Sequence, residues 1–139
     1  MNMRYETIEN DFVIYGFGVK GARENIPRAW KLLAPYIDTD ESYGVCRNGN
    51  RERNWYIAGI KRNIDHPDVQ QETIKAGKYI VETVEGGIPG IPKTYDELFS
   101  LKNIEVINAP NFEKYIHPPG SKEDVIEIWL PVKYKQNFR

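Results

Sequence analysis

The feature that most constrains the fold is a repeated pattern, spaced by one constant offset along the chain. Two short segments, 19–21 and 84–86, are each followed after the same gap by Ile-Pro, a basic residue, an aromatic residue and a leucine. The matching residues are Ile26, Pro27, Trp30 and Leu33 in the first copy and Ile91, Pro92, Tyr95 and Leu98 in the second. Chance can supply one Ile-Pro pair but hardly the whole spaced set. The pattern therefore predicts an internal duplication, with repeats over about residues 1–65 and 75–139.

Each repeat reads as strand, helix, strand, strand. Proline in a first turn, followed by apolar residues at helical spacing, predicts helices over 26–35 and 91–99. Period-two alternation and turn residues predict the strands, which fall within 5–20, 43–47, 54–62, 78–84, 112–116 and 125–132. The polar segment 64–75 is expected to be a connector between the halves. These elements predict an α+β fold of duplicated β-α-β-β units with pseudo-twofold symmetry. Its antiparallel sheets carry the helices on one side and leave a central ligand groove on the other.

Composition narrows the class of protein. A chain of 139 residues with 40% hydrophobic and 28% charged residues is expected to form one globular domain over 1–139. The net charge of −1 argues against a nucleic-acid-binding domain. A single cysteine, Cys46, and the lack of a long apolar run favour a cytoplasmic protein without membrane contact. Two isolated histidines, His66 and His117, make a poor metal site, so neither a metal nor a cofactor is expected.

The last two predicted strands carry acidic and aromatic residues on polar faces. Glu113 and Tyr115 share one face of the first strand, and Glu127 and Trp129 share one face of the second. If the strands pair across the turn at 117–121, the four side chains are expected to line one surface. An acid among aromatic rings suits an apolar, cationic small molecule. An ordinary hairpin with one solvent-exposed face explains the same pattern.

Several spaced motifs together resemble the GyrI-like family. They are Trp55-Tyr56-Ile57-Ala58-Gly59-Ile60, Ala76-Gly77-Lys78-Tyr79, Glu85-Gly86-Gly87, Phe112-Glu113-Lys114-Tyr115 and Glu127-Ile128-Trp129-Leu130-Pro131-Val132. Members of this bacterial family occur alone, as in the gyrase-inhibitory protein, or as effector-binding domains of MerR-type and AraC-type regulators. The resemblance covers nearly the whole chain, although each motif by itself is weak.

The resemblance implies a duplicated β-α-β-β fold whose central pocket takes amphipathic, often cationic, aromatic compounds. The family's pocket acid falls on Glu113, and a second acid and an aromatic residue fall on Glu127 and Trp129. The regulators' DNA-binding segment has no counterpart here, so direct DNA binding is not expected.

The complete expected ligand-binding set adds neighbouring tyrosines. Burial among aromatic walls would raise the pKa of Glu113, and a ligand cation would compensate its charge. Periodicity leaves open whether Trp55 or Tyr56 faces the groove, and the equivalent helix residues Trp30 and Tyr95 are expected mainly in the core. The expected set is Glu113, Tyr115, Glu127, Trp129, Tyr56, Tyr79 and Tyr95.

Three functions remain open at this point. The first is a stand-alone binding protein that senses or sequesters amphipathic, cationic aromatic molecules. The second, suggested by hydrolases within the family, is a small hydrolase in which Glu113 is the catalytic residue and activates water. The third is a regulator that acts on a protein partner, either DNA gyrase or a transcription regulator.

Overall fold

The structure is a computed structural model that describes residues 3–20, 23–47, 55–120 and 123–134. Within these ranges two α-helices, three short 3-10 helices and nine strands follow one another along the chain. The helices are η1 (Arg23–Asn25), α1 (Ile26–Leu33), η2 (Ala34–Tyr36), η3 (Ile88–Gly90) and α2 (Ile91–Phe99). The strands are β1 (Met3–Ile8), β2 (Phe12–Lys20), β3 (Glu41–Cys46), β4 (Trp55–Ile60), β5 (Gln70–Ile74), β6 (Gly77–Thr83), β7 (Ile104–Val106), β8 (Asn111–Ile116) and β9 (Val125–Tyr134).

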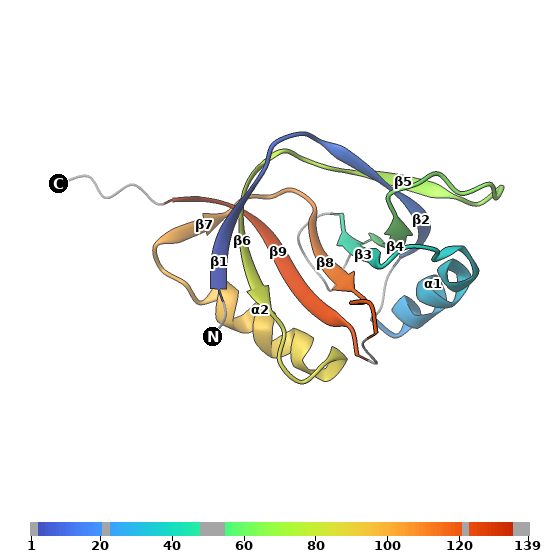
Figure 1. Cartoon of the computed structure of the whole chain (residues 1–139). Helices are drawn as coiled ribbons and strands as arrows, with labels where there is room; N and C mark the ends of the chain where they lie inside the picture. The colour runs from blue at the N-terminus through green and yellow to red at the C-terminus, as the bar shows by residue number, and fades with distance from the viewer. Residues whose placement is uncertain (1–2, 21–22, 48–54, 121–122, 135–139) are drawn as a thin grey trace.

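Eight strands form one curved antiparallel sheet in the order β1-β6-β9-β8-β3-β4-β2-β5, and β7 pairs with β9 (Figure 1). From its outer strand towards the centre, the first half has the order β2-β4-β3 and the second half has the order β6-β9-β8. Corresponding strands therefore follow the same order in both halves. The halves meet where β3 pairs with β8. The sheet and its two α-helices confirm the predicted α+β class, whereas the duplication itself stays a prediction.

Both α-helices pack on one face of the sheet. Helix α1 lies against β2 and β4 and buries Ala29 and Leu33, which are one turn apart. Helix α2 lies against β6 and β9 and buries residues three or four positions apart, including Tyr95 and Leu98. Figure 1 shows the two helices well separated from each other, each beneath its own half of the sheet.

The outer strands tie the two halves together. Strand β1 pairs with β6 of the second half, and β5 pairs with β2 of the first half. The expectation that 64–75 is only a connector is therefore wrong, because β5 occupies its last part. An edge strand with partly exposed side chains on both faces carries little apolar alternation, which is why this strand was not visible in the sequence. The three-residue strand β7 was missed because of its length.

The sheet face away from the helices holds a packed cluster of apolar side chains, which we call the aromatic cluster. It consists of Ile14, Tyr43, Val45, Ile74, Tyr79, Val81, Phe112 and Trp129. The rings of Phe112 and Trp129 stack with their centroids 5.4 Å apart. This packing fills space that the sequence-based prediction assigned to the ligand groove.

No helix in the described ranges has the length and apolar character needed to cross a membrane.

Gly16 on β2 allows β2 and β4 to approach closely, and its replacement should destabilise the fold. A Cβ atom at Gly16 would collide with the backbone oxygen of Ala58 and would lie 2.6 Å from Cα of Gly59. We expect Gly16→Ala to lower the free energy of unfolding by about 1–3 kcal/mol. Gly18→Ala is the matched control, because a Cβ there meets only the end of the Gln70 side chain. Urea denaturation measures both, and equal stability of the two variants would contradict the packing argument.

Candidate small-molecule-binding pocket

A cavity of about 480 Å³ lies on the helix face of the sheet, between the first turns of α1 and α2. We call it the helix-face pocket. Its lining consists of Ile26, Pro27, Trp30, Tyr56, Ile88, Ile91, Pro92, Glu113 and Tyr115. Each α-helix contributes the Ile-Pro pair with which it begins. Glu113 is the one charged residue in this lining. The volume is within the range typical of pockets that take small organic molecules.

Glu113 is buried, with 5% of its surface exposed, and lies on β8 at the junction of the two halves. Its Oε1 accepts two hydrogen bonds, one from the Tyr56 hydroxyl at 2.9 Å and one from the Tyr115 hydroxyl at 2.7 Å. Hydrogen bonds to a carboxylate stabilise its charged form and offset part of the cost of burial. Tyr56 comes from the first half and Tyr115 from the second, so both halves hold this acid.

Trp30 extends this network to helix α1. Its indole Nε1–H donates to the Tyr56 hydroxyl at 2.9 Å. The rings of Trp30 and Tyr115 pack in a T-shaped arrangement, with the centroids 4.8 Å apart. Because Tyr56 accepts from Trp30, its own proton is directed towards Glu113. The three aromatic side chains and the acid therefore form one connected wall of the helix-face pocket.

Gly44 on β3 makes room for this wall. It pairs directly with Glu113 across the junction of the halves and with Ala58 of β4. A Cβ atom at position 44 would overlap the Tyr56 hydroxyl and would lie 2.9 Å from Oε1 of Glu113. The acid and its donor can therefore lie flat over the sheet only because this residue has no side chain.

Burial raises the pKa of Tyr56 and Tyr115 well above the usual value, and the negative charge of Glu113 raises both pKa values further. The two hydroxyl groups therefore remain protonated, and remain donors to the carboxylate, throughout the neutral and mildly alkaline range.

Three of the predicted ligand-binding residues lie together in this pocket, namely Glu113, Tyr115 and Tyr56. The question left open between Trp55 and Tyr56 is answered by β4, which directs Tyr56 to the helix face. Whether these residues bind a ligand stays a prediction.

Glu127 and Trp129 lie on the opposite face of the sheet, so the expectation of a single surface with Glu113 and Tyr115 is wrong. Strand β9 pairs Ile128 opposite Glu113 and places Trp129 opposite Phe112. Residues directly opposite in an antiparallel pair share a face, which sends Glu127 and Trp129 to the side of the aromatic cluster.

The charge of Glu127 is already matched there. Arg4 donates to its Oε2 at 2.8 Å, and the indole Nε1–H of Trp129 donates to its Oε1 at 3.1 Å. This acid has a structural ion pair on the far side of the sheet from the helix-face pocket.

Tyr79 and Tyr95 are also outside the pocket. Tyr79 belongs to the aromatic cluster, and its hydroxyl donates to the backbone oxygen of Lys75 at 2.7 Å. Tyr95 is 1% exposed in the apolar core between α2 and the sheet. It occupies the repeat position equivalent to Trp30, yet Trp30 reaches the pocket and Tyr95 does not. The expectation that both rings belong mainly to the core therefore holds for Tyr95 alone.

The pocket also lies on a different face of the sheet from the predicted groove. It was expected on the sheet face away from the helices, but the cavity opens on the helix face. The residues missed for this reason are Ile26, Pro27, Trp30, Ile88, Ile91 and Pro92. Their signal was present in the sequence, because the two Ile-Pro pairs are the most distinctive part of the repeat.

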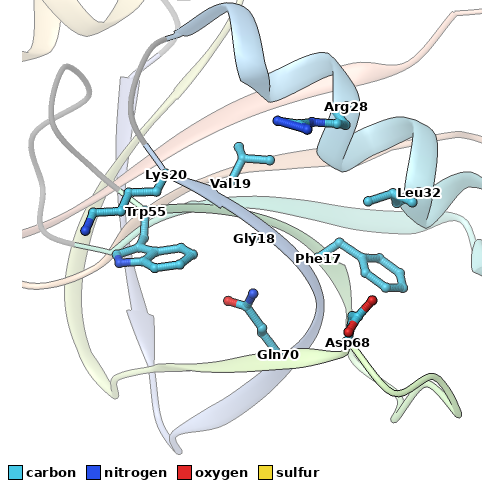
Figure 2. Close-up of a pocket in the computed structure, with 9 residues that line it drawn as sticks. All are labelled: Phe17, Gly18, Val19, Lys20, Arg28, Leu32, Trp55, Asp68 and Gln70. Atoms are coloured by element: carbon cyan, nitrogen blue, oxygen red, sulfur yellow. The ribbon is translucent and has the colours of Figure 1, made fainter.

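A second hollow, of about 380 Å³, lies beside the end of β2 and the outer side of α1. Figure 2 shows Lys20 next to Trp55, with Arg28 on the helix side and Gln70 and Asp68 across from it. The Nζ atom of Lys20 lies 6.0 Å from the centre of the Trp55 ring. This hollow mixes charges of both signs, unlike the helix-face pocket.

A family model described as GyrI-like small molecule binding domain matches residues 14–133. No curated protein sequence matches the chain. Among solved structures, an integron cassette protein from Vibrio cholerae is similar with a TM-score of 0.73 and 16% identity, over 96% of this chain and 97% of that one. SAV2435 bound to tetraphenylphosphonium is similar with a TM-score of 0.69 and 19% identity, over 96% and 94%. EcmrR in a complex with DNA is similar with a TM-score of 0.67 and 12% identity, over 95% of this chain and 57% of that one.

The buried hydroxyl groups of Tyr56 and Tyr115 should make the free energy of unfolding decrease at alkaline pH. Tyrosine in an unfolded chain ionises near pH 10, whereas folded Tyr56 and Tyr115 keep their protons because their pKa values are raised. The folded state then binds more protons than the unfolded state, so stability falls as pH rises above about 10. We expect the double variant Tyr56→Phe/Tyr115→Phe to lose stability less steeply, by up to about 1.4 kcal/mol per pH unit for each tyrosine removed. Urea denaturation between pH 8 and 11 measures the slopes, and parallel slopes would contradict the burial of these hydroxyl groups.

Proposed function

The chain belongs to the GyrI-like family of small-molecule-binding domains, and from this premise we propose that its helix-face pocket binds amphipathic aromatic cations. In this role the protein senses or sequesters such compounds. The single observation that carries the proposal is the buried carboxylate of Glu113 in a lining that is otherwise uncharged.

The carboxylate supplies the electrostatic part of recognition. Coulombic attraction between a carboxylate and a cation is stronger in a water-poor pocket than at an open surface. The two tyrosine hydroxyls fix Oε1 in place, so the acid is positioned before a ligand arrives.

The remaining walls supply apolar and aromatic contact. The rings of Trp30, Tyr56 and Tyr115 can attract a delocalised cation by about 0.5–2 kcal/mol each. Ile88 lines the opening and is 68% exposed, so a ligand that covers it would remove apolar surface from water. A compound with aromatic groups around a central charge meets both requirements.

A structural relative supports this class of ligand. SAV2435, which shares the fold over 96% of this chain, was solved with tetraphenylphosphonium, a cation surrounded by four aromatic rings. The shared fold gives the reason to choose this compound as a probe, and the proposal itself rests on the residues of this chain.

Binding of tetraphenylphosphonium should depend on Glu113. We expect the compound to quench the fluorescence of Trp30, and Glu113→Gln to weaken binding by at least about tenfold, because the variant keeps the shape of the side chain but loses its charge. Glu127→Gln is the matched control, since this buried acid lies on the other sheet face and should leave the affinity unchanged. Equal affinity of wild type and Glu113→Gln would refute the proposed role of the charge.

One observation also favours a second function. A buried carboxylate held by two hydroxyl donors in a small apolar pocket is an arrangement suited to a general base that activates water. Under this alternative the protein is a small hydrolase that acts on electrophilic compounds. Turnover of an activated aryl ester that is abolished in a folded Glu113→Ala variant would establish catalysis. Binding without turnover would reject the hydrolase alternative.

A further inference from the structure

A separate cavity of about 350 Å³ lies between α2 and β6, and none of its lining residues belongs to the helix-face pocket. We call it the α2 cavity. It is lined by Glu82, Thr83, Glu85, Gly90, Lys93, Thr94 and Glu97. Three carboxyl groups and one ammonium group thus face a small space, whereas the helix-face pocket has one acid among apolar walls.

Glu82 is the unusual member of this lining. Glu82 lies on the same face of β6 as Ile80, which belongs with Val84 to the apolar core under α2. Only 4% of its surface is exposed, and Oε1 has no hydrogen-bond partner among the described residues. A buried carboxylate oxygen left without a partner is costly, so in a native fold it calls for an explanation such as a functional role or a bound water or ion.

Glu97 adds a second carboxyl group beside Glu82. It lies on α2, where Lys93 precedes it by one turn. The pKa of Glu82 is raised to about 7, mainly by burial and next by the hydrogen bond and negative charge of the neighbouring Glu97. The pair therefore holds a proton near neutral pH when the cavity contains no cation.

The chemistry of the lining selects the kind of ligand. Thr94 donates its hydroxyl proton to the backbone oxygen of Gly90 at 2.9 Å, so this proton is not directed at the acids. Within the described ranges no three acidic, histidine or cysteine side chains are placed to hold a metal ion. Lys93, the ammonium group of this lining, is exposed and forms no ion pair with Glu82 or Glu97 among the described residues. A ligand with a positive charge and several N–H donors would therefore find both carboxyl groups available.

We propose that the α2 cavity binds the ammonium group of a small primary amine, with N–H donors directed to Oε1 of Glu82 and to the carboxylate of Glu97. This goes beyond the proposed function, because the ligand class differs. The helix-face pocket suits a delocalised cation without N–H groups, whereas the α2 cavity requires hydrogen-bond donors.

Ligand binding at this site should release a proton. An alkylammonium group keeps its charge up to about pH 10, whereas the empty Glu82–Glu97 pair holds a proton near pH 7. The other charged residues that line the cavity are Glu85 and Lys93, both exposed to solvent. Entry of the ammonium group displaces the proton of the pair, so affinity rises between pH 6 and pH 8.

Isothermal titration of the full chain with 1,4-diaminobutane tests the proposal. We expect saturable binding at pH 8 that weakens at pH 6, with proton release visible as a difference in heat between two buffers of unlike ionisation enthalpy. Glu82→Gln and Glu97→Gln should each weaken binding by at least about tenfold. The analogue in which both nitrogens are trimethylammonium groups keeps the charges but has no N–H donors, and it should bind at least about tenfold more weakly than the parent compound.

Two control variants separate this site from the rest of the surface. Glu105→Gln removes an exposed acid that pairs with Lys133 at 3.3 Å, and it should leave diamine binding unchanged. Glu113→Gln should also leave it unchanged, so failure here and failure of the proposed function can be told apart. Circular dichroism checks that each variant is folded, and Glu97→Gln serves alone if Glu82→Gln does not fold.

Diamine binding that is absent at pH 8, or equal in wild type and in both Glu→Gln variants, would show that the carboxyl pair takes no such ligand.

Discussion

The helix-face pocket depends on the hydrogen bonds that bring Tyr56 and Tyr115 to Oε1 of Glu113. These bonds join residues of both halves across the β3–β8 junction. Burying this acid would be unfavourable without the hydroxyl donors. The donors reach it only because Gly44 leaves space above the sheet. The pocket with its buried carboxylate can therefore form only when the two halves associate.

The sheet separates two buried acids of different character. Glu127 is matched by the guanidinium of Arg4 on one face, whereas Glu113 on the other face is held by hydroxyl groups and borders a cavity. A carboxylate that is already paired with a guanidinium has little electrostatic attraction left for a third group. Hydroxyl donors position a carboxylate without cancelling its charge, so the side chain of Glu113 retains the capacity to attract a cation.

The sequence was sufficient for the α+β class, both helices, most strands and three residues of the pocket, because these follow from local periodicity and family motifs. The sheet face on which Glu127 and Trp129 lie could not be predicted from the sequence. The structure pairs odd-numbered residues of β8 with even-numbered residues of β9, as in Glu113 with Ile128. A change of one residue in that register exchanges the two faces, and the connecting segment gives no local signal for it. The different locations of Trp30 and Tyr95 likewise depend on how each helix packs.

The two Ile-Pro pairs raise an apparent conflict, because the N-terminus of a helix carries a partial positive charge that disfavours a cation. This effect is limited to about 0.3–1 kcal/mol for an exposed helix end. Cation–π contact with the rings of the pocket contributes about 0.5–2 kcal/mol per ring. Pro27 and Pro92 have no backbone N–H and present ring carbons to the pocket, which removes one donor from each helix start. The helix ends therefore oppose a bound cation only weakly compared with the aromatic walls and the carboxylate of Glu113.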